Sequence, residues 1–290
     1  MKTLSLKLYD TIVKGKKMLS EDSISRISSY VQTQRVDDVC FMNRSGKPDP
    51  YYTLFGWMLC IILGIQMDLK KMKAYLDEAD TSKMNLVNYA AHLRCRMLLD
   101  YATMKGKLSL LFHKFVPAHL SFEDKDRLVP NGDPDSPYSL FIRMMMAEDS
   151  GRMASHMKEH LDTLNLYHLK EGGFANSKDA TSATLNATNA ALCFKGQLTG
   201  FKKNEDVDFL KRSQEMTGGF CASKGSLMPD LLTTATSLFT LHCYGEHPLT
   251  SPLPFVEAHW LDSGGFAATL AENNSDVEYS FYGLLALGTL

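Results

Sequence analysis

Residues 264–287 read GGFAATLAENNSDVEYSFYGLLAL, which is a Gly-Gly-Phe triplet, a polar loop, an Asp and then an apolar segment. The same triplet occurs at 172–174 and at 218–220, so two successive intervals of 46 residues separate its three copies. A period of this length is typical of one helical hairpin per repeat. We therefore predict three repeated hairpins over residues 166–290.

The segments that follow the triplets are apolar or small on nearly every side. They cover residues 184–192, 233–241 and 279–287. A helix of this kind is buried on all faces, whereas the more polar residues 203–215 suit an outer layer. Asp230 and Asp276 stand three residues before two of these helices, where a carboxylate can cap the helix N-terminus. Asp179 is expected to cap the third.

Residues 1–165 carry the same helix entry without its glycines. Asp49 and Asp135 precede apolar segments at the same offset, and residues 86–100 form a further apolar segment between them. Six hairpins of this period nearly fill the 290 residues. We therefore predict an all-α, single domain over residues 1–290, in which six hairpins close into an α/α barrel.

Composition excludes several classes of protein. The net charge is −2, with 22% charged and 44% hydrophobic residues, which argues against disorder and against nucleic acid as the main partner. The longest apolar run, residues 58–65, is too short to span a membrane. Residues 1–10 lack the continuous apolar core of a secretory signal, so we expect a cytoplasmic protein.

The repeat resembles a known superfamily. A Gly-Gly-Phe triplet, a polar loop, an Asp and an apolar helix that starts with Tyr or Thr are similar to the repeat of protein prenyltransferase β subunits and of squalene and terpene cyclases. The resemblance covers residues 166–290 well and the first half in patches. It implies an α/α toroid with a central cavity that opens at the N-termini of the inner helices. It also implies an isoprenoid ligand and a helical partner subunit.

The resemblance implies a zinc site that this sequence does not reproduce. The prenyltransferases hold Zn²⁺ with an Asp, a Cys two residues later and a His of the following repeat. Asp276 keeps the first position, Glu278 replaces the Cys and Tyr52 replaces the His. In a closed ring the last repeat abuts the first, so these three side chains are able to converge. Because carboxylates favour harder ions than Zn²⁺, we predict no metal and no cofactor.

The diphosphate clamp of the prenyltransferases is also missing. They place Arg and Lys in the loop before the metal-binding Asp, but the corresponding loop here, residues 267–275, contains no base and one acid. A diphosphate carries several negative charges and needs basic partners. The loop therefore argues against prenyl diphosphate chemistry.

Terpene cyclases suggest a second chemistry. They protonate an alkene with the middle Asp of an Asp-x-Asp-Asp run, and the nearest match is Asp133-Pro134-Asp135-Ser136, with Asp135 in the place of the acid. Such an acid must be kept neutral by burial. The alternative is that Asp135 only caps its helix.

Aromatic side chains on the expected inner helices are candidates to line the cavity, where an apolar chain or a carbocation would meet their faces. We therefore predict Asp135, Asp276 and Glu278 as catalytic residues. The predicted substrate-binding residues are Tyr52, Trp57, Tyr138, Tyr279 and Tyr282.

Three functions remain open at this point. The first is an isoprenoid-handling transferase or cyclase that lacks the usual zinc site. The second is a non-catalytic toroid that binds a lipid or a protein partner. The third is a hydrolase or lyase that uses the three predicted carboxylates on an α/α barrel.

Overall fold

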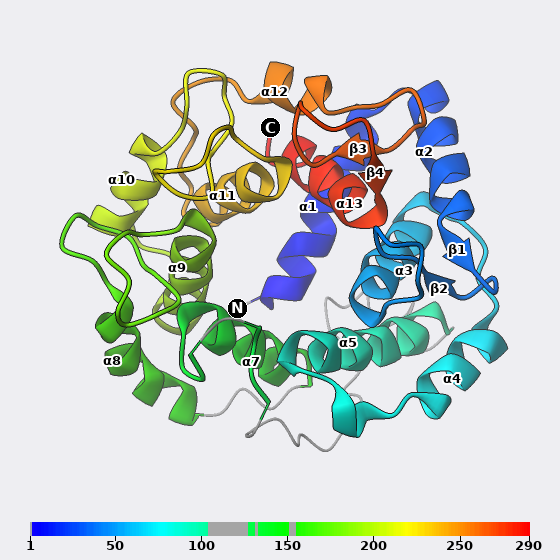
Figure 1. The fold of residues 1–290 in the computed structure, drawn as a ribbon, viewed down its shortest axis with the longest axis horizontal. Coiled ribbons are helices and arrows are strands. Elements are labelled where there is room, and N and C mark those ends of the chain that lie inside the picture. The colour runs from blue at the N-terminus through cyan, green and yellow to red at the C-terminus, as the bar shows by residue number, and fades with distance from the viewer. Residues whose placement is uncertain (1, 104–126, 131–132, 151–154) are drawn as a thin grey trace.

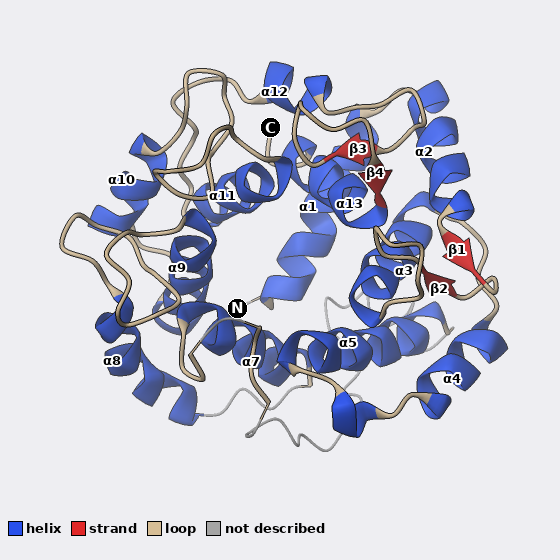
Figure 2. Cartoon of the chain, viewed as in Figure 1, coloured by secondary structure: helices blue, strands red, loops and turns tan. Residues whose placement is uncertain are grey.

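The computed structural model describes residues 2–103, 127–130, 133–150 and 155–290, and helices dominate it (Figures 1 and 2). The prediction of an all-α chain is therefore confirmed. Six helices occupy the positions that the sequence predicts for the inner layer. They are α3 (Pro50–Leu63), α5 (Leu86–Ala102), α7 (Pro137–Asp149), α9 (Leu185–Thr199), α11 (Leu231–Cys243) and α13 (Val277–Leu287).

The six inner helices contact one another in chain order, and α13 then packs against α3. Figure 1 shows these helices around a middle into which α1 (Leu4–Met18) extends. Five further helices among the described residues lie outside them, as the polar spacers predict. These are α2 (Glu21–Thr33), α4 (Leu69–Glu78), α8 (His160–Leu164), α10 (Glu205–Arg212) and α12 (Leu253–Ala258), with 3₁₀ turns at Thr81–Lys83, Ser155–Glu159 and Asn165–Tyr167.

Helix α1 is the element that the repeat does not predict. It packs mainly against α13 and also contacts α3 and α7. Two glycines permit this approach: a Cβ on Gly15 would lie 1.9 Å from the Leu284 carbonyl oxygen, and a Cβ on Gly288 would lie 1.7 Å from the Thr11 carbonyl oxygen. No side chain fits at either position.

A recurring hydrogen bond joins each loop to its inner helix. In the three repeats the amide of the triplet Phe donates to a hydroxyl in the first turn of the next inner helix, and an amide outside the triplets does the same in the first half. The pairs are Phe174 with Thr188 (2.9 Å), Phe220 with Thr234 (2.9 Å), Phe266 with Ser280 (3.4 Å) and Phe41 with Thr53 (3.0 Å). Phe41 thus takes the role of the triplet Phe in a hairpin that has lost the glycines.

Two short antiparallel strand pairs accompany these loops (Figure 2). Strand β1 (Arg35–Val36) pairs with β2 (Cys40–Phe41), and β3 (Phe266–Ala267) pairs with β4 (Ser275–Asp276). The second pair sets Phe266 opposite Asp276. This pairing therefore fixes the position of Asp276, the residue that caps α13.

The helix caps agree with prediction at three positions and differ at two. Asp49, Asp230 and Asp276 cap α3, α11 and α13. The expected caps Asp135 and Asp179 are wrong, because Ser136 caps α7 and Thr184 caps α9. At α7 the reason is Pro137, since a proline with no N–H favours the first helical position and makes the residue before it the cap.

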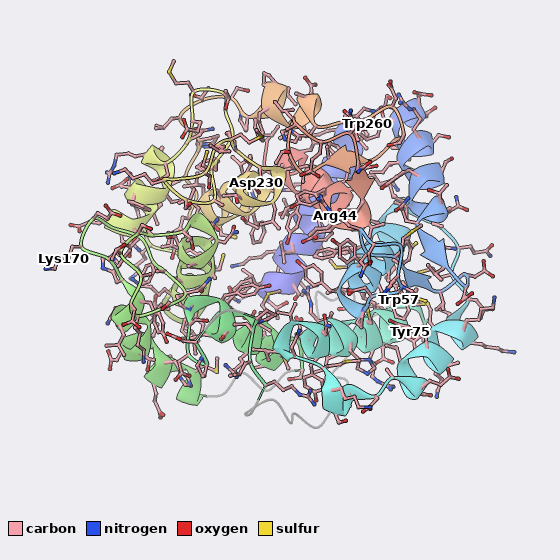
Figure 3. All side chains as sticks on the ribbon, in the orientation of Figure 1. Arg44, Trp57, Tyr75, Lys170, Asp230 and Trp260 are labelled. Carbon is pink, nitrogen blue, oxygen red and sulfur yellow. The ribbon has the colours of Figure 1, made fainter. Side chains whose placement is uncertain are left out.

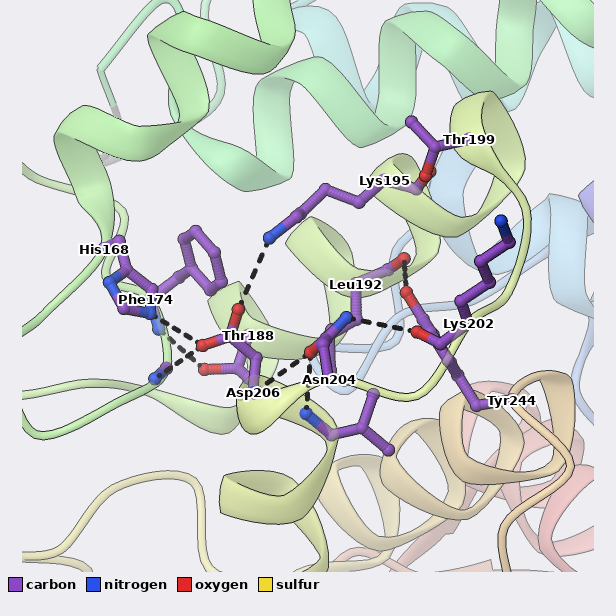
Figure 4. A network of polar contacts seen from close by, with 12 residues as sticks. His168, Phe174, Thr188, Leu192, Lys195, Thr199, Lys202, Asn204, Asp206 and Tyr244 are labelled. Atoms are coloured by element: carbon purple, nitrogen blue, oxygen red, sulfur yellow. Dashed lines mark hydrogen bonds and ion pairs between the residues drawn. The ribbon is translucent and has the colours of Figure 1, made fainter.

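A buried polar cluster fastens α10 to the loop of the first Gly-Gly-Phe triplet (Figure 4). Asp206 Oδ1 lies 2.7 Å from His168 Nε2 and accepts from the Gly173 amide, while Lys195 Nζ lies 3.4 Å from Oδ2. The nearby Thr188 hydroxyl donates to the Thr184 carbonyl and accepts from Phe174. These contacts join α10 to the loop before α9, so the cluster acts as a structural brace.

Candidate functional site

A cavity of about 430 Å³ lies among the inner helices. All six inner helices and α1 contribute side chains to its wall, and the wall is mostly apolar. Its aromatic members come from four different helices. They are Tyr51, Phe55, Tyr138, Phe141, Phe239, Phe281 and Tyr282.

A buried carboxyl group lies behind the wall of this cavity, in the first turn of α13. Glu278 is 7% exposed, and Tyr51, which lines the cavity, donates its hydroxyl proton to Glu278 Oε1 at 2.7 Å. Burial raises the pKa of Glu278 to about 7, and the hydrogen bond from Tyr51 opposes that rise. Burial also holds the pKa of Tyr51 well above its usual value, so the phenol stays neutral.

Beside it, Asp276 is tied into the protein at both oxygens. Its Oδ1 accepts from the Tyr279 amide at 2.8 Å, and its Oδ2 accepts from Arg44 Nε at 2.8 Å. Arg44 also donates to Glu272 at 2.9 Å and lies over the Tyr279 ring, 4.9 Å from its centroid. Figure 3 places Arg44 beside α13, where the first and last hairpins meet. Asp276 is therefore a cap and an ion-pair partner.

The structure brings together most of the predicted site residues. Asp276 and Glu278 lie on the first turn of α13, and Tyr52 lies close enough to Glu278 to lower the pKa of that acid. Tyr138 and Tyr282 line the cavity as expected. The last hairpin and the first do converge.

Three other predicted residues have their main contacts outside the cavity. Trp57 is fully buried, donates its indole N–H to the Val39 carbonyl at 2.6 Å and packs edge-on against Tyr75 of α4 (Figure 3). Tyr279 lies under Arg44, and Asp135 lies in the turn before α7. None of the three is among the described residues that line the cavity, and neither are Tyr52, Asp276 and Glu278.

Two residues of the site are not among the eight predicted catalytic and substrate-binding residues. Tyr51 contacts Glu278 directly, and the only available signal was its position next to Tyr52 on an aromatic-rich helix entry. Arg44 lies outside the repeated segment, between β2 and α3. No spacing in the sequence connects it with Asp276.

The side chains do not fit the zinc site of the prenyltransferases. The positions of its Cys and His hold Glu278 and Tyr52, and the retained Asp276 is already paired with Arg44. Within the described ranges, no three His, Cys, Asp or Glu side chains are grouped as metal ligands would be. A thiolate-binding Zn²⁺ needs nitrogen or sulfur ligands, and this set offers only oxygen.

Comparison with known protein families finds no family model that matches the chain, and no curated protein matches it either. Within the part of the chain that the structure describes, no helix is both long enough and apolar enough to cross a bilayer.

Proposed function

We propose that this protein is an α/α toroid that binds an uncharged isoprenoid or a similar apolar molecule in its central cavity and transfers a proton at the cavity mouth. The toroid is supported by the cyclic contact order of the six inner helices and by the outer helices between them. The observation that carries the proposal is the Tyr51–Glu278 pair at one end of an apolar cavity. Cavities of this size accept drug-sized ligands.

The hydroxyl of Tyr51 contacts the ligand, and Glu278 is hydrogen-bonded to that hydroxyl from outside the cavity wall. With a pKa of about 7, Glu278 is present in both protonation states at neutral pH, which suits general acid–base work. When Glu278 is ionised, Tyr51 passes its proton to Glu278 as it takes a proton from the ligand, so the phenol stays neutral. When Glu278 is protonated, Tyr51 gives its proton to the ligand as it takes the proton of Glu278, which leaves Glu278 ionised.

The charges around the cavity favour a neutral head group over a diphosphate. Arg44 already shares its charge between Asp276 and Glu272. Among the described residues that line the cavity, Arg94 is the one base, and it lies 3.5 Å from Asp149. A diphosphate would therefore lose its hydration without gaining the donors that it needs.

The experiment is a thermal unfolding series with farnesyl methyl ether and farnesyl diphosphate. A ligand at one hundred times its Kd stabilises the folded state by about 2.7 kcal/mol, which shifts the melting temperature by roughly 5 °C. We expect this shift with the ether and a much smaller one with the diphosphate. No shift with either compound would reject the proposal.

Paired variants distinguish ligand binding in the cavity from general effects of a substitution on the protein. Ala190→Phe places a ring in the central cavity and should abolish the shift, whereas Ala74→Phe makes the same change on the exposed side of α4 and should preserve it. Glu278→Gln should preserve binding of the ether but abolish turnover of any substrate found. Retained turnover in that variant would remove the acid–base role.

A non-catalytic toroid is the second candidate. Leu227 and Met216 are 98% and 93% exposed on the loops around the second triplet, and the resemblance to prenyltransferase β subunits implies a partner subunit. Full binding of the ether together with an unchanged pKa of Glu278 in the complex would favour this candidate. The hydrolase or lyase alternative has less support, because Asp276 cannot serve as a second acid while Arg44 holds it.

A further inference from the structure

The second residues of the six inner helices gather around the central cavity. Five of them line its wall, and the sixth, Glu278, is hydrogen-bonded to one of the five, Tyr51. Asn186 of α9 is the one amide in this set and is exposed although it lines the cavity. A ligand that enters from solvent is therefore able to reach its side chain. The five residues in the wall are Tyr51, Val87, Tyr138, Asn186 and Leu232.

Two carboxamide groups of this wall have an occupied oxygen and a free nitrogen. They belong to Asn186 and to Asn176, which lies in the loop before α9. Asn176 Oδ1 accepts from the Tyr138 amide at 3.2 Å, and Asn186 Oδ1 accepts from the Thr233 hydroxyl at 3.5 Å. Neither Nδ2 atom has a hydrogen-bond partner among the described residues, and neither is sealed from solvent. The protein therefore leaves the N–H donors of both amides to a ligand.

The neighbouring polar side chains of this wall donate to protein atoms instead. Asn189 donates to the hydroxyls of Thr236 and Ser237, at 3.2 and 3.0 Å. The Thr240 hydroxyl donates to the Thr236 carbonyl at 2.8 Å. These donors are used within the protein, so the two carboxamides with free Nδ2 atoms are the ones that select the ligand.

The charges near the two carboxamides favour a neutral acceptor. The Asp133 amide donates to the Asn176 carbonyl at 3.4 Å, and Asp230 accepts from the Thr233 hydroxyl at 2.8 Å, so an acidic residue stands next to each group. A carboxylate or phosphate would meet these acids without a free cation to offset them. A carbonyl oxygen has two lone pairs and accepts from two amides without adding charge.

We propose that the ligand of the central cavity is a neutral carbonyl compound, whose carbonyl oxygen accepts from Asn176 and Asn186. Asn186 belongs to α9, which lies across the ring of inner helices from α3 and its Tyr51 (Figure 1). The carbonyl group therefore contacts the side of the cavity opposite the proton-transfer pair. This inference rests on the proposed function, because it names the chemical class of the ligand of that same cavity.

The test is titration calorimetry of the unmodified protein with geranylacetone and with its methylidene analogue, in which a CH₂ group replaces the carbonyl oxygen. The two compounds have nearly the same shape, so a difference in Kd reports on the oxygen. Two hydrogen bonds between neutral groups correspond to roughly a tenfold change in Kd. We expect the ketone to bind more tightly than the analogue by this factor.

A third ligand, geranate, tests the choice of a neutral head group. Its carboxylate offers acceptor oxygens to the same amides but adds a negative charge beside Asp133 and Asp230. We expect geranate to bind more weakly than geranylacetone at pH 8. Tighter binding of geranate would contradict the proposal.

Variants assign the preference for the ketone to the two amides. Asn186→Leu removes one donor at similar volume and should reduce the preference to about threefold, with the Kd of the analogue unchanged. Asn176→Asp keeps an oxygen for the Tyr138 amide but loses its donor, and should reduce the preference as well. Asn88→Leu is the matched change in the first turn of α5, at a residue outside the described cavity wall, and should leave both Kd values unchanged. Circular dichroism checks that each variant folds.

The remaining outcomes each overturn the proposal. Equal affinity for the ketone and the analogue in the unmodified protein would do so and would leave the proposed apolar ligand standing. A preference that persists in both Asn186→Leu and Asn176→Asp would mean that other groups hold the carbonyl oxygen. Absence of binding of both compounds would also reject it, and the farnesyl methyl ether shift then decides separately whether the cavity binds an apolar molecule.

Discussion

The two ends of the inner helices each hold a buried pair of acids and one arginine, but the pairs have different roles. At the N-terminal end, Asp276 pairs with Arg44 and Glu278 accepts from a phenol that faces the cavity. At the other end, Asp149 lies near Arg94, and its neighbour Glu148 accepts from the Leu4 amide and from Gln197. Glu278 at the first end therefore contacts a side chain of the cavity wall, whereas Glu148 at the second end fastens α1.

Helix electrostatics explains this difference. Asp276 caps α13 at its N-terminus, where the helix dipole favours a negative charge. Glu148 and Asp149 stand at the C-terminus of α7, where the dipole of α7 disfavours them. Helix α1 compensates: its first turn contains no acid of its own, and its N-terminal amide points at Glu148. Glu148 therefore supplies the negative charge at the N-terminus of α1, a helix far from it in sequence.

The largest predicted effect is the difference in stability lost when each of the two arginines is replaced. Arg94→Met leaves Asp149 buried without its cation, and breaking such a pair costs about 3–5 kcal/mol. Arg44→Met should cost about 1 kcal/mol, because the Arg44 side chain is 44% exposed and water can replace part of its contact with Asp276. Urea unfolding of both variants measures the free energies. Equal losses would contradict the contrast between the two ends.

The next effect concerns the docking of α1. Gly288→Ala forces a methyl group against the Thr11 carbonyl and should destabilise the protein by about 1–3 kcal/mol, as overpacking does. Gly225→Ala is the matched change in a loop at the other end, where no atom lies within 4 Å of the added carbon. We expect that variant to stay within about 0.5 kcal/mol of the parent. A neutral Gly288→Ala would mean that α1 does not depend on this contact.

A third effect is a pH dependence that differs between the ends. Burial raises the pKa of Asp149 from 3.8 to about 6 and that of Glu278 from 4.5 to about 7. Because the folded state holds these protons more tightly than the unfolded state, stability is present below the unfolded pKa and is lost as the pH rises through the folded pKa. Each acid should therefore remove roughly 2–3 kcal/mol between about pH 4 and pH 7.

Variants assign that loss to each end. Asp149→Asn should flatten the stability curve below about pH 6, and Glu278→Gln should flatten it up to about pH 7, as followed by urea midpoints across the pH range. A curve that rises with pH over this window in the parent protein would show that neither acid is held in its neutral form.

Much of the cluster around Asp276 and Glu278 was predictable, because a repeat places equivalent residues at equivalent positions. The Gly-Gly-Phe spacing located the inner helices, and the Asp three residues before the apolar segment located the cap of α13. Closure of the repeats also predicted that Glu278 would meet the first hairpin. The exact contact was missed, since the choice between Tyr51 and Tyr52 depends on the rotation of α3 about its axis, which no repeat encodes.

By itself, the sequence determined the all-α class, the six inner helices and the acidic entry of α13, because burial periodicity and helix caps are local properties. Only the tertiary structure decided that Arg44 neutralises Asp276, that Trp57 packs against α4, and that α1 supplies the donors for Glu148. These contacts join residues tens to hundreds of positions apart, as in the Leu4–Glu148 pair. Such pairs are formed by the arrangement of the helices in space, and no periodic pattern along the chain records them.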